Sequence, residues 1–426
     1  MRIDSTLESY FDVSTPQGNG CGPRLKSTTG GKRTLKQRIF EFVRSSGQTA
    51  RTDISRALDI SPGSATTLTA DLIEAGYLRE VAGLTREAGR GRPPVALEVV
   101  QDAHYVIGIK LSDEKNTAVL ADFAGNMVAD CSLPNDLGRR DLEALLDEIS
   151  ALMKTLLEES GNVMADVKAV GIGVSGIIDH EAGTVLWSPL LQLREVALGD
   201  AFIARFGIPV SLDNDANVLT LAELWFGAGR DMDNFAVVTI EHGVGMGVVV
   251  NNQLYRGAQG KGLELGHTKV QLDGALCRCG QRGCLEAYLA DYALAREAAT
   301  ALGRSLDTDQ SPQEMLENLF LKAKAGDLAA QTIFNRAGRY LSAGLSNVIQ
   351  LFDPPLIILS GERMQYDYLY GQEVIAEMHS LTLSEGRTPC MVETHAWGDL
   401  IWARGASALA LSAMTDRLFS KETQPA

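Results

Sequence analysis

Apolar residues recur every three or four positions in three short segments between residues 35 and 75, which predicts three amphipathic helices. The inner face of the first segment is expected to consist of Leu35, Ile39, Phe42 and Val43. The second segment has Thr52 or Asp53 as a candidate N-cap. In the third, Ser61 can cap the helix and Gly76 can end it.

The tight connection between the second and third segments is typical of a helix-turn-helix. In that motif the third helix of the bundle lies in a DNA groove, and here it would present Ser64, Thr66 and Thr67. Small three-helix bundles also serve as structural modules or bind other proteins. On the helices alone, both alternatives remain open.

The stretch "YLREVAGLTREAGRGRPPVALEVV", residues 77–100, predicts two strands around a basic, glycine-rich loop. A winged helix-turn-helix has such a hairpin after its third helix. Arg90 and Arg92 lie in this loop, where an extended backbone could place their guanidinium groups in a narrow minor groove. The hairpin therefore favours DNA binding over the other roles of a helical bundle.

From His104 onward, the pattern changes to strands that alternate with helices. Apolar runs such as residues 105–111 predict buried strands, and Asn251 and Asn252 form a hairpin turn signal between two later runs. Two α/β halves with a ligand-binding cleft between them are therefore expected. The predicted parts are a flexible tail (1–33), the DNA-binding head (34–97), a first lobe (98–230, joined by a C-terminal helix, 399–420) and a second lobe (231–398).

Charge is distributed unevenly along the chain, which has a net charge of −15. Residues 34–97 contain nine Lys or Arg and seven Asp or Glu, whereas the residues after 97 carry a net charge of −19. An acidic body repels non-specific phosphate contacts, so the distribution is compatible with a small DNA-binding head. Neither a signal peptide nor a long apolar span is evident, which predicts a cytoplasmic protein without membrane insertion.

The chain has six cysteines, of which Cys21, Cys131 and Cys390 are isolated, an arrangement that argues against a disulfide framework in a reducing compartment. The other three, Cys277, Cys279 and Cys284, follow His267 in a glycine-rich segment. One imidazole and three thiolates suit a closed, tetrahedral zinc site with a structural role. Reactive thiols or a chance cluster are the alternatives.

The segments "GLELGH" and "CRCGQRGCLEAY" resemble the ROK family, which groups sugar-responsive bacterial repressors with sugar kinases. The resemblance extends from about residue 34 to the C-terminal helix. It implies an α/β fold in which the winged helix-turn-helix precedes a two-lobed, actin-like ATPase (ribonuclease H-like) fold. It also implies a zinc ion bound by His267, Cys277, Cys279 and Cys284, and a sugar pocket that uses Glu264, His267 and Glu286.

A second motif, "SLDNDANVLTLAELWFG", resembles the Asn-Asp element of the same family and implies that Asn214 and Asp215 bind the sugar. In the family's kinases, the matching Asp is the general base for the sugar hydroxyl. In a binding protein it would only accept a hydrogen bond. Ser175 lies where the kinases usually have proline in the loop "GIGVSGIID".

The kinases also carry a first phosphate loop, Asp-x-Gly-Gly-Thr, from which this chain departs. Lys110 takes the place of the Asp, Ser112 and Asp113 replace the glycines, and Glu114 replaces the Thr. Two side chains crowd this loop and two carboxylates oppose an anion, so ATP binding should be badly impaired. The second glycine-rich turn, "HGVGMG" at residues 242–247, is intact but is a weak signal by itself.

These features predict a transcriptional regulator, not an enzyme. It would bind operator DNA as a homodimer or tetramer and repress sugar uptake or catabolism genes, until a sugar or sugar phosphate in the interlobe cleft releases it. The alternatives are an ATP-dependent sugar kinase of the same family and a structural or partner-docking protein. Glucose, N-acetylglucosamine, xylose and their phosphates offer similar rings of hydroxyls, so the effector is left open.

Overall fold

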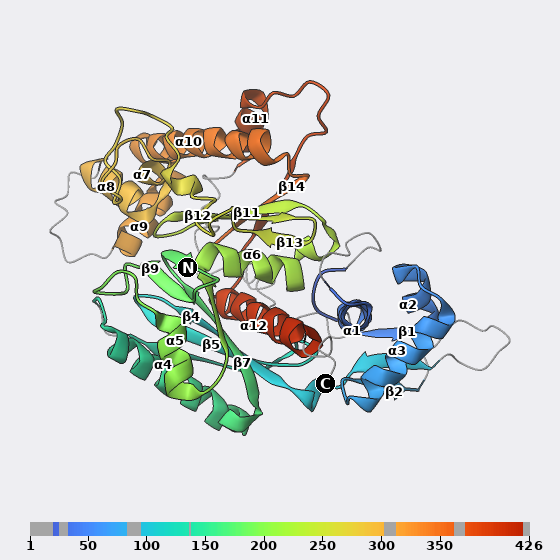
Figure 1. Ribbon diagram of the computed structural model, residues 1–426. Helices are drawn as coiled ribbons and strands as arrows, with labels where there is room; N and C mark the ends of the chain where they lie inside the picture. Colours follow the sequence, from blue (N-terminus) through green and yellow to red (C-terminus); the bar gives the residue numbers. More distant parts are fainter. Residues whose placement is uncertain are drawn as a thin grey trace. The chain divides into compact units, whose positions relative to one another are not determined.

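The computed structural model describes residues 20–24, 33–82, 95–135, 138–301, 312–361 and 371–420 (Figure 1). The described residues form two compact units. The first unit takes those of Asp12–Asp233, together with Val249–Leu254 and the described part of Asp399–Ala426. The second unit takes those of Asn234–Val248 and Tyr255–Gly398.

The first unit begins with three helices, α1 (Leu35–Ser46), α2 (Arg51–Leu58) and α3 (Pro62–Glu74). Thr34 caps α1 by accepting a hydrogen bond from the backbone N–H of Gln37, and Ser61 caps α3 by accepting one from Ser64. Helix α2 forms, but Thr52 and Asp53 do not cap it, because the helix already begins at Arg51 and its N-cap, Ala50, makes no side-chain hydrogen bond.

Three short antiparallel strands accompany these helices, in the order β1-β3-β2: β1 (Gln48–Ala50), β3 (Ala96–Val99) and β2 (Leu78–Val81). The loop predicted as a wing, with Arg90 and Arg92, lies outside the described residues. In α1 the structure buries Phe40 fully, whereas Phe42 is half-buried. The difference arises because Phe40 packs against Phe123 and Phe419, which come from parts of the unit far along the chain.

The main sheet of the first unit has the strand order β10-β7-β4-β5-β6. Its strands β4, β7 and β10 are parallel, whereas β5 and β6 are antiparallel additions at one side. The strand bounds are β4 (Tyr105–Leu111), β5 (Lys115–Asp122), β6 (Met127–Pro134), β7 (Val167–Val174) and β10 (Val210–Asn214). A small hairpin, β8 (Ile177–Asp179) and β9 (Thr184–Trp187), follows β7.

Helices cover this sheet, which explains why β4 and β7 are apolar on both faces. Helix α12 packs on β4 and β7 and also contacts α6, while α4 packs on β5 and β6 (Figure 1). The helix bounds are α4 (Leu142–Ser160), α5 (Leu198–Phe206), α6 (Asp215–Phe226) and α12 (Ile401–Ser420). A short 3₁₀ helix, η4 (Ala228–Asp231), follows α6.

A second five-stranded sheet has the order β13-β12-β11-β14-β15, with β11, β14 and β15 parallel. Asn251 and Asn252 both have positive φ, at 51° and 59°, in the turn between β12 and β13. The strand bounds are β11 (Phe235–Ile240), β12 (Val244–Val250), β13 (Gln253–Tyr255), β14 (Leu356–Ser360) and β15 (Met391–His395).

Five helices lie in the described part of the second unit, and its apolar core includes Phe334, Leu341 and Leu345 of the longest of them, α10. They are α7 (Glu286–Leu289), α8 (Asp291–Ala301), α9 (Pro312–Lys324), α10 (Leu328–Phe352) and α11 (Gln372–Leu381). The 3₁₀ helix η5 (Leu265–His267) precedes α7. None of the helices in the described part of the chain is long and apolar enough to cross a bilayer.

Glycines set how closely α12 approaches the first sheet. A Cβ atom on Gly108 of β4 would lie 2.0 Å from the backbone oxygen of Ala403, and one on Gly171 of β7 would lie 2.0 Å from that of Ala406. Backbone atoms of a packed helix cannot move aside cheaply. The approach of α12 therefore requires glycine at both positions.

We predict that Gly108→Val lowers the free energy of unfolding of the first unit by about 3 kcal/mol or more, because the new side chain overlaps the backbone of α12. Urea unfolding is the measurement. Gly63→Ala in α3 is the matched control, since its Cβ would meet only Ser61 at 3.7 Å and a helical alanine should stabilise by about 0.5 kcal/mol. Equal stability of Gly108→Val and the native chain would contradict this account of the packing.

Candidate metal centre and effector-binding residues

His267 and three cysteines form a cluster in the second unit, on the loop between η5 and α7. Cys277 starts a tight turn in which its oxygen accepts the N–H of Gly280, and its own N–H donates to Gln281. Gly283 has a φ of 75°, and a Cβ there would lie 1.8 Å from the oxygen of Gln271. Glycine at this position thus lets the loop fold back on itself, which brings the cysteine side chains close to one another.

The geometry of the cluster fits a tetrahedral metal ion. The four ligand atoms all lie within 4.8 Å of one another. Cys279 Sγ and Cys284 Sγ are 3.7 Å apart, and Cys277 Sγ lies 3.8 Å from His267 Nδ1. A tetrahedral zinc site with Zn–S bonds of about 2.3 Å has sulfur–sulfur separations of about 3.8 Å. The cluster can therefore hold a metal ion without large movement of these side chains.

Two neighbours of the cluster had no distinct signal in the sequence. The ammonium of Lys269 lies 2.9 Å from Cys284 Sγ, where it can offset the net negative charge that three thiolates leave on a divalent metal site. The hydroxyl of Tyr292 lies 3.5 Å from Cys277 Sγ. A lone lysine and a helical tyrosine are too common in sequences to indicate these contacts.

The structure places Glu264, His267 and Glu286 at or beside this cluster. His267 turns Nδ1 toward Cys277, and its Nε2 lies 4.0 Å from a carboxylate oxygen of Glu264. Glu286 lies with one oxygen 3.5 Å from Cys277 Sγ, and its other oxygen accepts the N–H of Val244 at 3.5 Å. One imidazole nitrogen can thus bind a metal while the other faces the carboxylate of Glu264.

Asn214 and Asp215 lie in the first unit, where β10 ends and α6 begins. Asn214 caps α6 by accepting the N–H of Asn217 at 2.7 Å. The hydroxyl of Ser175, at the end of β7, donates to Asp215 at 2.8 Å. The serine that replaces the kinases' proline therefore helps to hold the aspartate, and Asp215 keeps further acceptor capacity for a ligand hydroxyl.

The loop that matches the first phosphate loop is closed by its own hydrogen bonds. Asn116 accepts the backbone N–H of Ser112 at 3.0 Å, and the Ser112 hydroxyl donates to the oxygen of Lys115 at 2.6 Å. Asn135 donates to the oxygen of Ser112 at 2.8 Å. A phosphate in such a loop binds to free backbone N–H groups. The N–H of Ser112 is not available to a phosphate, because it donates to Asn116.

The side chain of Lys110, which takes the place of the kinases' Asp, is directed at α12. Its ammonium lies 3.6 Å from the centre of the Trp402 ring, in a cation–π contact with the first turn of α12. Lys115, at the far side of the loop, pairs with Asp399 just before that helix. The side chains of Asp113 and Glu114 are exposed.

Three of the residues predicted to read DNA lie on the N-terminal half of α3. Ser64, Thr66 and Thr67 are all exposed. The Thr66 hydroxyl donates to the oxygen of Pro62, and the Ser64 hydroxyl is 2.9 Å from that of Ser61. Helix α3 therefore presents a small, polar surface with hydroxyl groups that are compatible with a DNA groove.

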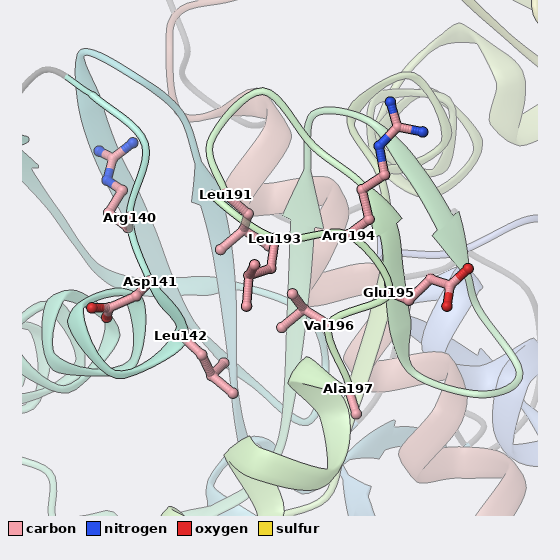
Figure 2. Close-up of a pocket in the computed structure, with 9 residues that line it drawn as sticks. All are labelled: Arg140, Asp141, Leu142, Leu191, Leu193, Arg194, Glu195, Val196 and Ala197. Atoms are coloured by element: carbon pink, nitrogen blue, oxygen red, sulfur yellow. The ribbon is translucent and has the colours of Figure 1, made fainter.

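A cavity of about 190 Å³ in the first unit contains none of the predicted site residues. Figure 2 shows aliphatic side chains, among them Leu191 and Val196, in its middle, with the guanidinium groups of Arg140 and Arg194 at the edge and turned away from them. Arg140 donates to Glu148 and to the oxygen of Ser112 instead. The cavity is thus an aliphatic hollow beside the closed loop.

The chain is similar to known proteins over most of its length. Residues 106–413 match the model of the ROK family. A putative xylose repressor from Caldicellulosiruptor sp. (strain Rt8B.4) is 26% identical over 388 residues, which cover 90% of this chain and 96% of the relative.

Two solved structures extend this similarity to the fold. A ROK family transcriptional regulator, described as a homolog of the E. coli Mlc protein, has a TM-score of 0.74 and 26% identity, covering 91% of this chain and 97% of its own. A ROK family glucokinase from Streptomyces griseus, in complex with glucose and AMPPNP, has a TM-score of 0.62 and 29% identity, covering 72% of this chain and 99% of the kinase. The chain thus has an α/β fold with an actin-like ROK domain.

We predict that Cys279→Ser lowers the affinity of the cluster for a divalent metal at least about 100-fold, because it removes one thiolate ligand. Elemental analysis of the dialysed protein is the measurement, with Co²⁺ as an optical probe of thiolate ligation. Cys390→Ala is the control, since Cys390 is buried outside the cluster and its loss should leave the metal content unchanged. Equal metal content in both variants and the native chain would rule out the site.

Proposed function

Because the chain belongs to the ROK family, we propose that it is a DNA-binding transcriptional repressor that a sugar or sugar phosphate releases from its operator. One observation carries the proposal: α1–α3 and the β1-β3-β2 sheet precede the residues that match the ROK model and form an N-terminal module with exposed hydroxyls on α3. The coverage of the relatives supports it. Similarity to the ROK regulator covers 91% of the chain, whereas that to the glucokinase covers 72%.

In this proposal the N-terminal module is a winged helix-turn-helix. Ser64, Thr66 and Thr67 of α3 contact the major groove, and Arg90 and Arg92 of the wing enter the minor groove. A homodimer, or a tetramer built from dimers, places two such modules on the halves of a palindromic operator. The protein acts in the cytoplasm, where the operator is.

The proposed effector-binding residues are those that the family resemblance implies. Asn214 and Asp215 accept or donate hydrogen bonds to sugar hydroxyls, as do Glu264, His267 and Glu286. Carboxylates and an imidazole suit a pyranose because they form charge-assisted hydrogen bonds with its hydroxyls. A structural zinc ion, bound by His267 and the three cysteines, fixes the position of His267 and Glu286.

The second candidate function is an ATP-dependent sugar kinase. The intact pair of Asn214 and Asp215 favours it, because an ionised carboxylate at this position can accept the proton of a sugar hydroxyl. The closed loop at Ser112 and the cation–π contact of Lys110 oppose it, since the N–H of Ser112 is already bound by Asn116 and a lysine stands where the kinases have the aspartate. We therefore place the repressor first.

We predict that the purified chain retards a DNA fragment from its own promoter region in a gel-shift assay. One sugar from a panel of glucose, N-acetylglucosamine, xylose and their 6- or 5-phosphates should weaken this binding by about 5–150-fold. A fragment of equal length and scrambled sequence is the control. No retention at low salt, together with sugar-dependent consumption of ATP, would replace the repressor by the kinase.

We also predict that Asp215→Asn weakens the response to the sugar at least about tenfold while it spares operator binding, because the amide loses a charge-assisted acceptor. The sugar concentration that releases half of the operator is the measurement. Asp200→Asn, on α5, is the control. An unchanged sugar response in Asp215→Asn would remove this residue from the effector site.

A further inference from the structure

Residues 20–24 form an ordered segment that precedes α1 and lies within the stretch predicted as a flexible tail. The backbone N–H of Cys21 donates to the oxygen of Arg44 in the last turn of α1 at 3.0 Å. Gly20 lies against the same turn so closely that a Cβ would be 2.3 Å from that oxygen. For these five residues the structure corrects the prediction of a flexible tail. The other residues of the predicted tail up to residue 32, which are 1–19 and 25–32, lie outside the described part of the chain.

The same segment also contacts α6 and η4. The N–H of Gly22 donates to the oxygen of Trp225 at 2.9 Å, and the N–H of Arg24 donates to the oxygen of Arg230 at 2.9 Å. The side chain of Arg24 pairs with Asp231 at 3.0 Å. Since Pro23 has no N–H, every backbone donor from Cys21 to Arg24 is used, and together they join α1 to α6 and η4, which are far from it in the sequence.

Cys21 lies at the centre of this junction. Its side chain is 4% exposed, and its thiol lies 2.7 Å from the oxygen of Ala124, in the turn between β5 and β6. Gly125 leaves room for it, because a Cβ on Gly125 would be 2.0 Å from the sulfur. Burial raises the pKa of the Cys21 thiol to about 11, so the thiol is protonated and unreactive while the segment stays in place.

Two arginines reinforce the junction. The guanidinium of Arg44, from α1, lies 4.6 Å from the centre of the Trp225 ring and donates to the Thr415 hydroxyl of α12 at 3.0 Å. Arg230 donates to the oxygen of Ser45 at 2.8 Å and to that of Gly22 at 3.2 Å. The end of α1 is thus attached to α6, α12 and the segment 20–24 at once.

Helix α6 connects this junction to the proposed effector residues. It begins at Asp215, which Ser175 holds, and ends at Phe226, next to Trp225. Its twelve residues span about 18 Å. It packs against α12 so closely that a Cβ on Gly405 would be 1.8 Å from the oxygen of Val218. A displacement at its first turn is therefore passed to its last turn rather than absorbed by loose packing.

We propose that residues 20–24 are an intrachain clamp that fixes α1 of the DNA-binding module to α6 and α12, and that effector binding at Asn214 and Asp215 opens the clamp through α6. The inference rests on the proposed function. With the clamp closed, α1–α3 are held in one orientation, which a two-site operator requires. With the clamp open, the module is released, so operator affinity falls although the effector never touches it.

The reactivity of Cys21 reports directly on the clamp. N-ethylmaleimide and peptide mass mapping give the labelling rate of each cysteine, with the buried Cys131 as an internal reference. In the native chain without sugar, Cys21 should react as slowly as Cys131. The sugar that releases the operator should raise the Cys21 rate at least about fivefold. If no sugar releases the operator, each sugar of the panel is tested for this increase.

Arg230→Gln should open the clamp without sugar, because it removes the bonds to Ser45 and Gly22. We expect about tenfold faster labelling of Cys21, about tenfold weaker operator binding and a sugar response reduced to below about threefold. Gly20→Val is a second variant that alters only the segment. Arg205→Gln is the matched control, because Arg205 lies on α5 and pairs with Glu143 and Asp147.

The outcomes separate the clamp from the proposed function. If the native chain binds no operator, the proposed function fails, and the labelling of Cys21 still judges the clamp. Equal Cys21 rates in the native chain, Arg230→Gln and Gly20→Val would overturn the clamp. Fast labelling in both variants with native operator affinity and a native sugar response would overturn its coupling to DNA binding.

Discussion

The close packing of helix α12 against the first sheet is the constraint on which the rest of the first unit depends. Gly108 and Gly171 let the helix touch the strands, and Gly405 lets α6 touch the helix in turn. With no side chain between these backbones, the N-terminal half of α12 is fixed in position. Its first turn supplies Trp402, which binds Lys110, and its last turns supply Thr415 and Phe419, which contact Arg44 and Phe40 of α1.

The same helix also contacts β4, and Asp399 just before it pairs with Lys115 at the start of β5. In this chain Ser112, in the loop after β4, makes hydrogen bonds to Asn116 and Lys115, and Lys110 of β4 contacts Trp402 of α12. A loop whose N–H of Ser112 is bound by Asn116 has lost a donor that phosphoryl transfer would need. The carboxylate at Asp215 remains, and it can bind a hydroxyl without any chemistry on it.

The structural features that could be predicted are those that depend on residues close together in the sequence. Helical spacing indicated α1–α3, and Ser61 was a capping signal that the structure confirms. The spacing of Cys277, Cys279 and Cys284 indicated a ligand cluster, because a short glycine-rich loop must bring them together, and the structure forms it. The boundaries of the four predicted parts stay predictions, as do the DNA contacts of Arg90 and Arg92.

Contacts between distant segments could not be predicted. Phe40 is buried instead of Phe42 because Phe123 and Phe419 surround it, and neither is near it in the sequence. Residues 20–24 lack hydrophobic periodicity, and their order comes from backbone hydrogen bonds to Arg44, Trp225 and Arg230. Lys269 and Tyr292 likewise reach the cysteine cluster only through the fold.

Thermodynamic linkage tests the central claim, that this chain couples a sugar to DNA, most directly. A sugar that weakens operator binding must itself bind more weakly to the operator complex, by the same factor. Calorimetric titration of the sugar into the free chain and into the chain saturated with operator measures both affinities. The account predicts a dissociation constant about 5–150-fold larger in the complex. Equal affinities in the two titrations would contradict it.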